Sequence, residues 1–221
     1  MKTVPVTITI PVGPHPSNRR WLDDCLQSIE AQTVSPAEVL LIDDGAHLPE
    51  RPPLHIYRPP WRLGVAHAFN FGVALAENEA VIMLGSDDML FPEAVELAYA
   101  AYLGYGDPVG YLYFGVRYSD GVEQNYPCNA ALVTKTLWQM TGGFPVEGSV
   151  GGCDTLLISR MMAARGDLGH LLSIHDAVGG PLYWCRRHPE TETERGRGHR
   201  SSIVAQIRNV LTVEQLEGVS R

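Results

Sequence analysis

Three short apolar runs stand out in the first 90 positions, each followed by residues that favour turns. They are residues 4–12, which are rich in β-branched side chains, residues 39–42 and residues 81–84. Runs of this length bounded by Gly, Pro and Asp are typical of buried β-strands. The sequence therefore predicts three strands here, with a short additional strand at residues 54–57.

Helical patterns separate these runs. We expect Asn18 to cap a first helix that breaks at Ser35-Pro36, and we expect a second helix at residues 63–76. Their apolar residues recur at helical spacing and are Trp21, Leu22, Cys25, Leu26 and Ile29 in the first, and Val65, Phe69, Val73 and Ala76 in the second. Alternation of strand and helix predicts an α/β fold with a parallel sheet and right-handed crossovers.

The pattern changes after a helix that Phe91-Pro92-Glu93 is expected to open. Residues 110–118 alternate aromatic side chains, Ser119-Asp120-Gly121 is a hairpin signal, and residues 122–126 are the expected return strand. The remaining expected elements are a strand at 130–133, a helical turn at 135–140, a helix from Asp154 to Arg165, strands at 171–174 and 182–184, a mobile charged loop at 186–200 and a last helix at 201–216.

Composition narrows the class of protein. The 221 residues are 45% hydrophobic, enough for a full core, and the net charge of -8 argues against a nucleic-acid binder that works by neutralising phosphates. The four cysteines, which are Cys25, Cys128, Cys153 and Cys185, form no C-x-x-C pair and are expected to be free thiols. The N-terminus shows no signal-peptide pattern, and no apolar run reaches the roughly 20 residues of a membrane span. We therefore expect a cytoplasmic protein without a transmembrane segment.

Paired carboxylates follow the apolar run at 81–84. Gly85 and Ser86 lead into Asp87 and Asp88, and the carboxyl end of a parallel strand is where open α/β sheets bind ligands. Two like charges resist sharing one site unless a cation joins them, and a hard cation such as Mg²⁺ or Mn²⁺ suits oxygen ligands. The alternative is that Asp87 caps the next helix and that Asp88 is solvated.

A series of short motifs, in this order, resembles the family-2 inverting glycosyltransferases with the GT-A fold. The motifs are Pro11 after the first strand, Gln32-Thr33, residues 41–45 (LIDDG), residues 62–64 (RLG) with 66–70, residues 84–88 (LGSDD), residues 142–145 (GGFP), residues 152–154 (GCD) and residues 183–188. The resemblance covers residues 4–190. Family members often have Asp where Gly85 stands.

The resemblance implies a nucleotide-diphospho-sugar transferase fold, a mostly parallel central sheet flanked by helices, in one compact domain of two halves. Residues 1–109 would bind the nucleotide sugar, residues 110–190 would bind the acceptor and carry out catalysis, and residues 191–221 would be the charged loop and C-terminal helix. The implied reaction is a metal-dependent, inverting transfer of a sugar from a nucleotide-diphosphate sugar, most often a UDP-sugar, to an acceptor hydroxyl.

The resemblance also implies roles for individual residues. Asp44 would accept a hydrogen bond from the base, Pro11 and Val12 would line the base pocket through their backbone, and Arg62 would approach the base or diphosphate. Ser86 and Asp87 would lie at the donor. The ligands of Mn²⁺ or Mg²⁺ would be Asp88, Asp87 and His188, and Asp154 would be the catalytic base. Plainer roles stay open at this stage: a turn carboxylate for Asp44, a surface cation for Arg62, a structural imidazole for His188 and a helix cap for Asp154. Arg186, Arg187, Arg195, Arg197 and Arg200 form a basic tract, either a solvated loop or a lid over the diphosphate or an anionic acceptor.

The segment after the first strand fits two other enzyme classes less well. A sugar-phosphate nucleotidylyltransferase usually has a Gly-rich loop with Arg and Lys after the first strand, and residues 11–20 lack the repeated glycines and the Lys. A Rossmann dehydrogenase needs G-x-G-x-x-G after that strand, which is absent. A degenerate protein that binds carbohydrate or nucleotide without turnover is the non-enzymatic alternative. The sequence indicates neither the acceptor, which can be a saccharide, a lipid-linked sugar, a protein or a modified nucleic-acid base, nor the oligomeric state.

Overall fold

The computed structural model describes residues 2–106, 110–125, 129–144 and 171–190. The helix expected from Asp154, the last helix at 201–216, and the predicted catalytic residue Asp154 itself lie outside the described residues. The expected division of the domain at residue 109 stays a prediction.

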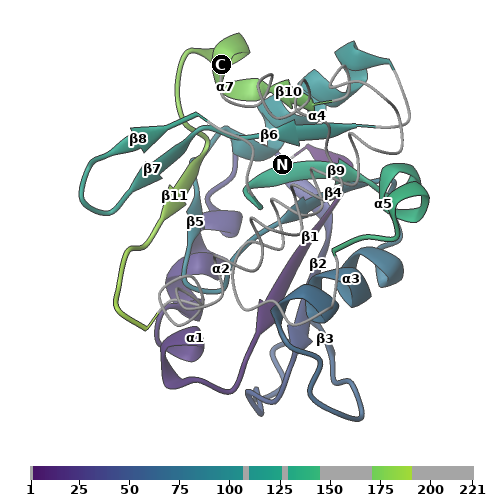
Figure 1. Cartoon of the computed structure of the whole chain (residues 1–221), viewed down its shortest axis with the longest axis vertical. Coiled ribbons are helices and arrows are strands. Elements are labelled where there is room, and N and C mark those ends of the chain that lie inside the picture. The colour runs from purple at the N-terminus through teal and green to yellow at the C-terminus, as the bar shows by residue number, and fades with distance from the viewer. Residues whose placement is uncertain (1, 107–109, 126–128, 145–170, 191–221) are drawn as a thin grey trace, which may run out of the picture.

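A mostly parallel sheet forms the centre of the chain (Figure 1). Within the described residues it has seven strands in the order β10-β6-β9-β4-β1-β2-β3. Their bounds are Thr3–Val12 for β1, Ser35–Asp43 for β2, His55–Tyr57 for β3, Ala80–Met83 for β4, Tyr111–Tyr113 for β6, Ala131–Thr134 for β9 and Leu171–Ser173 for β10. β9 is antiparallel to both neighbours, and the other pairings are parallel. The expected α/β class with a mostly parallel central sheet is confirmed.

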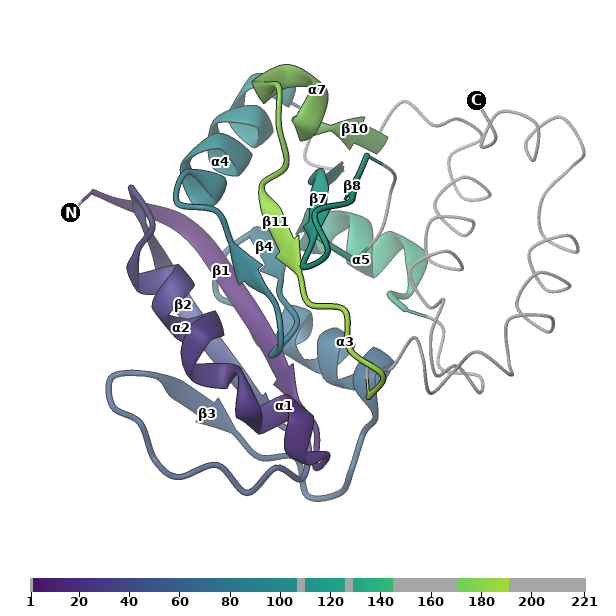
Figure 2. The same cartoon turned by 90° about the vertical axis from the view of Figure 1, so that its left-hand side faces the viewer.

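Helices cover both faces of this sheet, with α2 and α4 on one side and α3 and α5 on the other (Figure 2). Their bounds are Pro16–Arg20 for α1, Leu22–Glu30 for α2, Val65–Leu75 for α3, Ala94–Tyr105 for α4, Lys135–Thr141 for α5 and Ile174–Val178 for α7. No helix among these is long and apolar enough to cross a bilayer.

The alternation of side chains along β1 divides the core into two layers. Every second residue from Val4 to Val12 is buried in the cluster that includes the apolar residues of α2 and α4. On the opposite face, Thr9 is buried and meets Gly72 of α3, where an added Cβ would lie 1.9 Å from Thr9 Oγ1. Gly72 therefore lets α3 pack closely against β1.

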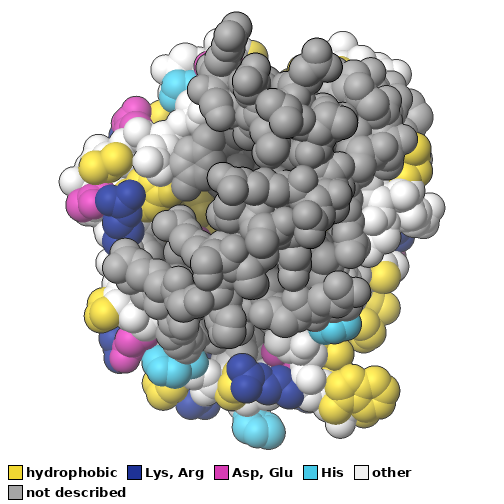
Figure 3. Space-filling view, viewed as in Figure 1, with side chains coloured by type: hydrophobic (Ala, Val, Ile, Leu, Met, Phe, Trp, Pro, Cys, Tyr) yellow, Lys and Arg dark blue, Asp and Glu magenta, His cyan; other side chains and the backbone are white. Residues whose placement is uncertain are grey.

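A second, smaller sheet carries the segments around the paired carboxylates. Its order is β5-β11-β7-β8, with bounds Met89–Leu90 for β5, Val116–Tyr118 for β7, Glu123–Gln124 for β8 and Tyr183–Cys185 for β11. β11 pairs antiparallel with β5 and parallel with β7, so it lies between two segments that are far from it in sequence. Acidic and basic side chains lie in small adjacent groups over β7 and β8 (Figure 3), in agreement with the ion pairs Arg117–Glu123 and Arg187–Asp120.

The first helical segment differs from the expectation of one helix capped by Asn18. The cap is His15, whose Nδ1 accepts a hydrogen bond from the Ser17 N–H at 3.3 Å, and Asn18 lies inside the first turn. The helix then breaks at Trp21, which separates α1 from α2 and is half-buried instead of lying on the apolar face. The other apolar residues expected on that face are buried: Leu22, Cys25, Leu26 and Ile29.

Further differences come from strand pairing. β2 begins at Ser35, not at residue 39, because Ser35 and Pro36 pair with the start of β1. Residues 110–118 form two strands, β6 and β7, which belong to different sheets. α4 begins at Ala94, beyond Pro92, which lies in the preceding turn. The pattern did not indicate β5 or α7, which are too short to show a period.

Gln32 joins the end of α2 to the segment that leads into α4. Its Nε2 donates to Ser28 O at 2.9 Å and to Phe91 O at 2.8 Å, and its Oε1 accepts from the Val95 N–H at 2.9 Å. The side chain is buried, so water does not replace these partners. Gln32 therefore fixes α2 relative to the chain that follows the paired carboxylates.

We expect Gln32→Leu to lower the free energy of unfolding by about 3 kcal/mol, because Phe91 O and the Val95 N–H lose a buried partner. Urea unfolding followed by circular dichroism measures this change. Gln27→Leu on the exposed side of α2 is the matched control and should change the free energy by less than about 0.5 kcal/mol. Equal losses in the two variants would show that the Gln32 contacts do not stabilise the fold.

Candidate active site

Gly85, Ser86, Asp87 and Asp88 form a tight turn, here called the acidic turn, between β4 and β5. The Asp88 N–H donates to Gly85 O at 3.1 Å and closes it. β4 is parallel to β1, so the acidic turn lies at the carboxyl end of a parallel strand, as predicted. Ser86 and Asp88 are buried there.

Gly85 stands where the family resemblance predicts an acidic side chain. A Cβ at this position would lie 2.7 Å from Asp88 Oδ2 and 3.1 Å from Asp87 Oδ1. Both carboxylates therefore lie over Gly85, and they do so because it has no side chain. The Cys25 thiol donates to Gly85 O at 3.5 Å. Burial is the main cause that raises the pKa of Cys25, and the charges of Asp88 and Asp87 raise it further, so the thiol stays neutral.

Donors from the segment around β11 hold the Asp88 carboxylate, and the Cys185 side chain is one of them. The Tyr183 hydroxyl donates to Oδ2 at 2.8 Å, and the Arg186 N–H donates to Oδ1 at 2.8 Å. Burial, followed by the charge of Asp87, raises the pKa of Asp88 to about 7, while these two hydrogen bonds act in the opposite direction. A cation beside the pair would oppose both the burial effect and the repulsion.

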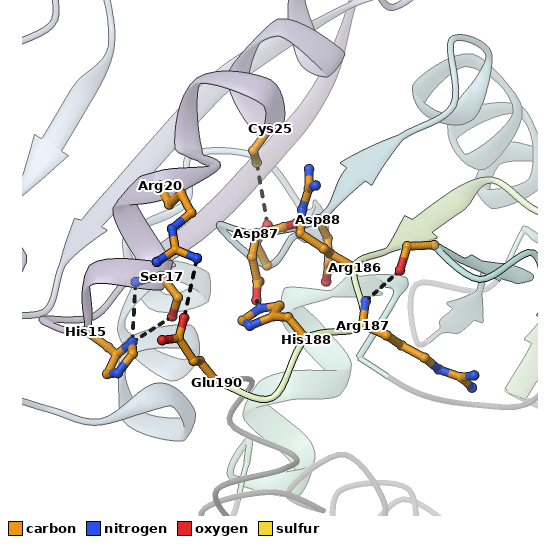
Figure 4. Close-up of polar contacts among 12 residues, drawn as sticks. His15, Ser17, Arg20, Cys25, Asp87, Asp88, Arg186, Arg187, His188 and Glu190 are labelled. Atoms are coloured by element: carbon orange, nitrogen blue, oxygen red, sulfur yellow. Dashed lines mark hydrogen bonds and ion pairs between the residues drawn. The ribbon is translucent and has the colours of Figure 1, made fainter.

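His188 lies against Asp87, as Figure 4 shows. Its Nε2 and Asp87 Oδ2 share a hydrogen bond of 2.9 Å, and its ring lies on Trp21 with 4.5 Å between the ring centroids. The His188 side chain is only 9% exposed, and its Nδ1 is buried without a hydrogen-bond partner among the residues that the structure describes. The structure thus brings together Asp87, Asp88 and His188, which were predicted from positions about 100 residues apart.

Residues 186–190, here called the strap, run from β11 along the acidic turn. The Arg186 guanidinium lies 4.8 Å from the Trp21 ring centroid and 4.7 Å from that of Trp184. Its Nε donates to Asp87 O at 3.1 Å, and its Nη2 donates to Asp24 Oδ2 at 3.1 Å. Cation–π contacts on two sides, with an ion pair to α2, therefore fix the start of the strap.

Asp44 follows β2 and is buried. Its Oδ1 accepts from the Leu63 N–H and its Oδ2 accepts from the Gly64 N–H at 2.9 Å, just before α3 begins. Its own N–H donates to Val12 O at 2.9 Å, so Val12 lies beside it at the end of β1. Asp44 therefore orders the loop that leads into α3, and recognition of a base by Asp44, Pro11 and Val12 stays a prediction.

The remaining predicted residues lie in different settings. Arg62 is exposed in the loop before α3, next to Trp61, whose side chain is 70% exposed. Within the basic tract, Arg186 donates a hydrogen bond to Asp87 O in the acidic turn, and Arg187 donates one to Asp120 in the hairpin. Arg195, Arg197 and Arg200 lie outside the described residues, as does Asp154, so their predicted roles are untested.

Sequence reasoning missed the residues that support the acidic turn. The motif at residues 183–188 contains Tyr183 but indicates no role for it, and the helical pattern places Trp21 on an apolar face. The available signal was the run of aromatic and basic residues from Tyr183 to His188, because such residues at a strand end are suited to hold carboxylates. Their hydrogen-bond partners lie up to 162 residues earlier, and local pattern does not identify them.

The residue types at the acidic turn fit a hard divalent cation. Two carboxylates and an imidazole with an unpartnered buried nitrogen are a suitable donor set for Mn²⁺ or Mg²⁺. In the described part of the chain, however, no group of three or more His, Cys, Asp and Glu side chains is arranged around one point. A cation would therefore bind by reorienting Asp87 and His188, which here bond to each other.

Comparison with known proteins identifies the family. The sequence model of glycosyl transferase family 2 matches residues 17–153, more than half of the chain. The chain belongs to this family. A search of curated protein sequences finds no match to it.

Solved structures of S. aureus TarS are similar to this family-2 chain. TarS 1-349 in complex with UDP-GlcNAc superposes with a TM-score of 0.71 at 15% sequence identity, over 96% of this chain and 68% of that one. TarS 1-349 in complex with UDP gives a TM-score of 0.64 at 15% identity, over 93% of this chain and 71% of that one. The longer TarS structure is covered over 43% of its length. The likeness confirms the GT-A type of fold, and the family confirms a glycosyltransferase.

We expect Asp44→Ala to lower the free energy of unfolding by about 2 kcal/mol, because it leaves the Leu63 and Gly64 N–H groups without an acceptor. Chemical denaturation measures the loss. The matched control is Asp23→Ala, since Asp23 is 79% exposed in its ion pair with Arg51 and should contribute at most about 1 kcal/mol. An Asp44→Ala protein as stable as the control would show that the loop does not depend on this carboxylate.

Proposed function

We propose that this glycosyltransferase moves a sugar from a UDP-sugar to an acceptor hydroxyl with inversion at the anomeric carbon, and that it depends on a divalent cation. The observation that carries the proposal is the acidic turn, where two carboxylates and His188 meet at the carboxyl end of β4 in a family-2 chain. The complex of the structurally similar TarS with UDP-GlcNAc supports a UDP-sugar as donor.

In this proposal Asp88, Asp87 and His188 hold Mn²⁺ or Mg²⁺. The cation, when bound, neutralises the diphosphate as it leaves. Asp88 is held in place by Tyr183 and by the Arg186 N–H, so it is the fixed ligand. Asp87 has one oxygen on His188, and a cation between them would replace this single hydrogen bond.

The donor would lie along the ends of β1, β2 and β4. Asp44 uses one hydrogen bond on each carboxylate oxygen, which leaves acceptor capacity for the imide N–H of a uracil base. Pro11 and Val12 adjoin Asp44 and would line the base through their backbone. Ser86 would lie at the ribose, and the exposed Arg62 is available to the diphosphate.

Asp154 is proposed as the general base. A carboxylate that removes the proton of the acceptor hydroxyl makes that oxygen a better nucleophile, and attack opposite the leaving diphosphate inverts the anomeric carbon. The acceptor itself is an open class of hydroxyl compounds.

The first test is metal-dependent donor binding. With Mn²⁺ present, UDP at about 100 times its dissociation constant should stabilise the protein by about 2.7 kcal/mol. The same UDP concentration in EDTA should raise the melting temperature less. Differential scanning fluorimetry measures both. Asp88→Asn should abolish the difference between Mn²⁺ and EDTA, whereas Asp120→Asn on the exposed hairpin should preserve it. Equal shifts with and without metal in the unmodified protein would overturn the metal assignment.

The second test concerns Asp154. Asp154→Asn should leave the affinity for UDP and Mn²⁺ unchanged and reduce transfer, or hydrolysis of the donor, by about 10²- to 10⁴-fold, which is the usual contribution of a general base. Calorimetry reports the affinity, and release of UDP reports the turnover. Near-normal turnover in this variant would place the base elsewhere, while a loss of UDP affinity would indicate that Asp154 supports the donor site.

A further inference from the structure

Tyr183 stands out because its hydroxyl makes two hydrogen bonds to the acidic turn from a buried position. It accepts from the Gly85 N–H at 3.0 Å and donates to Asp88 Oδ2 at 2.8 Å. The side chain is 2% exposed. One phenolic oxygen therefore connects the first residue of the turn with its last, and water has no access to take its place.

We propose that Tyr183 is a positioning residue that fixes the direction of the Asp88 carboxylate toward the donor site. This inference rests on the proposed function, because it assigns Asp88 to the cation and the donor diphosphate. Tyr183 acts through Asp88 and touches neither the donor nor the cation itself.

The contacts of Asp88 explain why the hydroxyl decides its direction. Asp88 has two further donors, the Arg186 N–H on Oδ1 and the Cys185 side chain, whose thiol is a weak donor. A carboxylate held at one oxygen can rotate about that hydrogen bond, whereas a carboxylate held at both oxygens has one orientation. Without the Tyr183 hydroxyl, the Arg186 N–H is the one strong donor left among the described residues, beside the weak thiol donor of Cys185.

Gly85 limits the same oxygen from the other side. A Cβ there would lie 2.7 Å from Asp88 Oδ2, which is too close for an unchanged carboxylate. Gly85 has no positive φ, so alanine suits its backbone and acts through its contacts with the Asp88 and Asp87 carboxylates. The hydroxyl of Tyr183 and the missing side chain of Gly85 thus define one position for Oδ2.

The backbone around Asp88 does not depend on the hydroxyl. β11 pairs with β5 through main-chain hydrogen bonds, with Tyr183 opposite Leu90 and Trp184 opposite Met89. The Tyr183 ring belongs to the core cluster shared with α2 and α4, and phenylalanine retains it. Tyr183→Phe therefore removes the positioning contact and keeps the fold.

The experiment compares Tyr183→Phe and Gly85→Ala with the unmodified protein. Each variant should bind UDP about tenfold more weakly in Mn²⁺, and bind UDP unchanged in EDTA, because only the cation-dependent part passes through Asp88. Tyr99→Phe, which removes a hydroxyl from α4, is the matched control and should bind UDP normally in both conditions. Calorimetry supplies the affinities. Unchanged affinity of Tyr183→Phe in Mn²⁺, whatever its melting temperature, would overturn the proposal.

A crystal structure of metal-free Tyr183→Phe provides a second measurement that does not require donor binding. The Asp88 carboxylate should leave the position over Gly85 while β5 and β11 stay paired. An unmoved carboxylate would overturn the inference even if the variant binds UDP more weakly. If the unmodified protein fails to bind UDP with Mn²⁺, the proposed function fails, and a displaced carboxylate in the variant still supports the positioning role of Tyr183.

Discussion

The repulsion between Asp87 and Asp88 is the constraint on which the described site depends. Burial of Asp88 at the strand end raises its pKa, and the charge of the adjacent Asp87 raises it further. The chain compensates with donors from one segment: the Tyr183 hydroxyl and Arg186 N–H on Asp88, and His188 on Asp87. The small sheet brings this segment alongside the turn, because β11 pairs with β5, which begins immediately after Asp88.

Trp21 extends this arrangement to the helices. Trp21 lies at the break between α1 and α2, and its indole is contacted by Arg186, His188 and Arg20. Arg20 also forms an ion pair of 3.6 Å with Glu190 at the far end of the strap. The residue at the helix break thus supplies the surface on which the strap lies.

The sequence predicted what depends on neighbouring residues. The strands β1 and β4, the hairpin around Asp120 and the position of the acid pair at a strand end follow from local apolar pattern and turn residues. The start of α1 was predicted at Asn18 and not at His15, because histidine is an unusual cap and its role depends on the contact with Ser17. The anchoring of Asp44 on Leu63 and Gly64, and of Asp88 on Tyr183, depends on pairs of residues far apart in the chain, which a single sequence does not link.

The long connection between Asp88 and Tyr183 has a consequence for the order in which the protein acquires its structure. These residues are 95 positions apart, so their contact requires the closing of a long loop, which is slow compared with the pairing of β1 and β2. During synthesis the carboxylates emerge well before the hydroxyl that orients them. The parallel half of the sheet can therefore form around an acidic turn that is not yet ordered, and the contact between Tyr183 and Asp88 forms later.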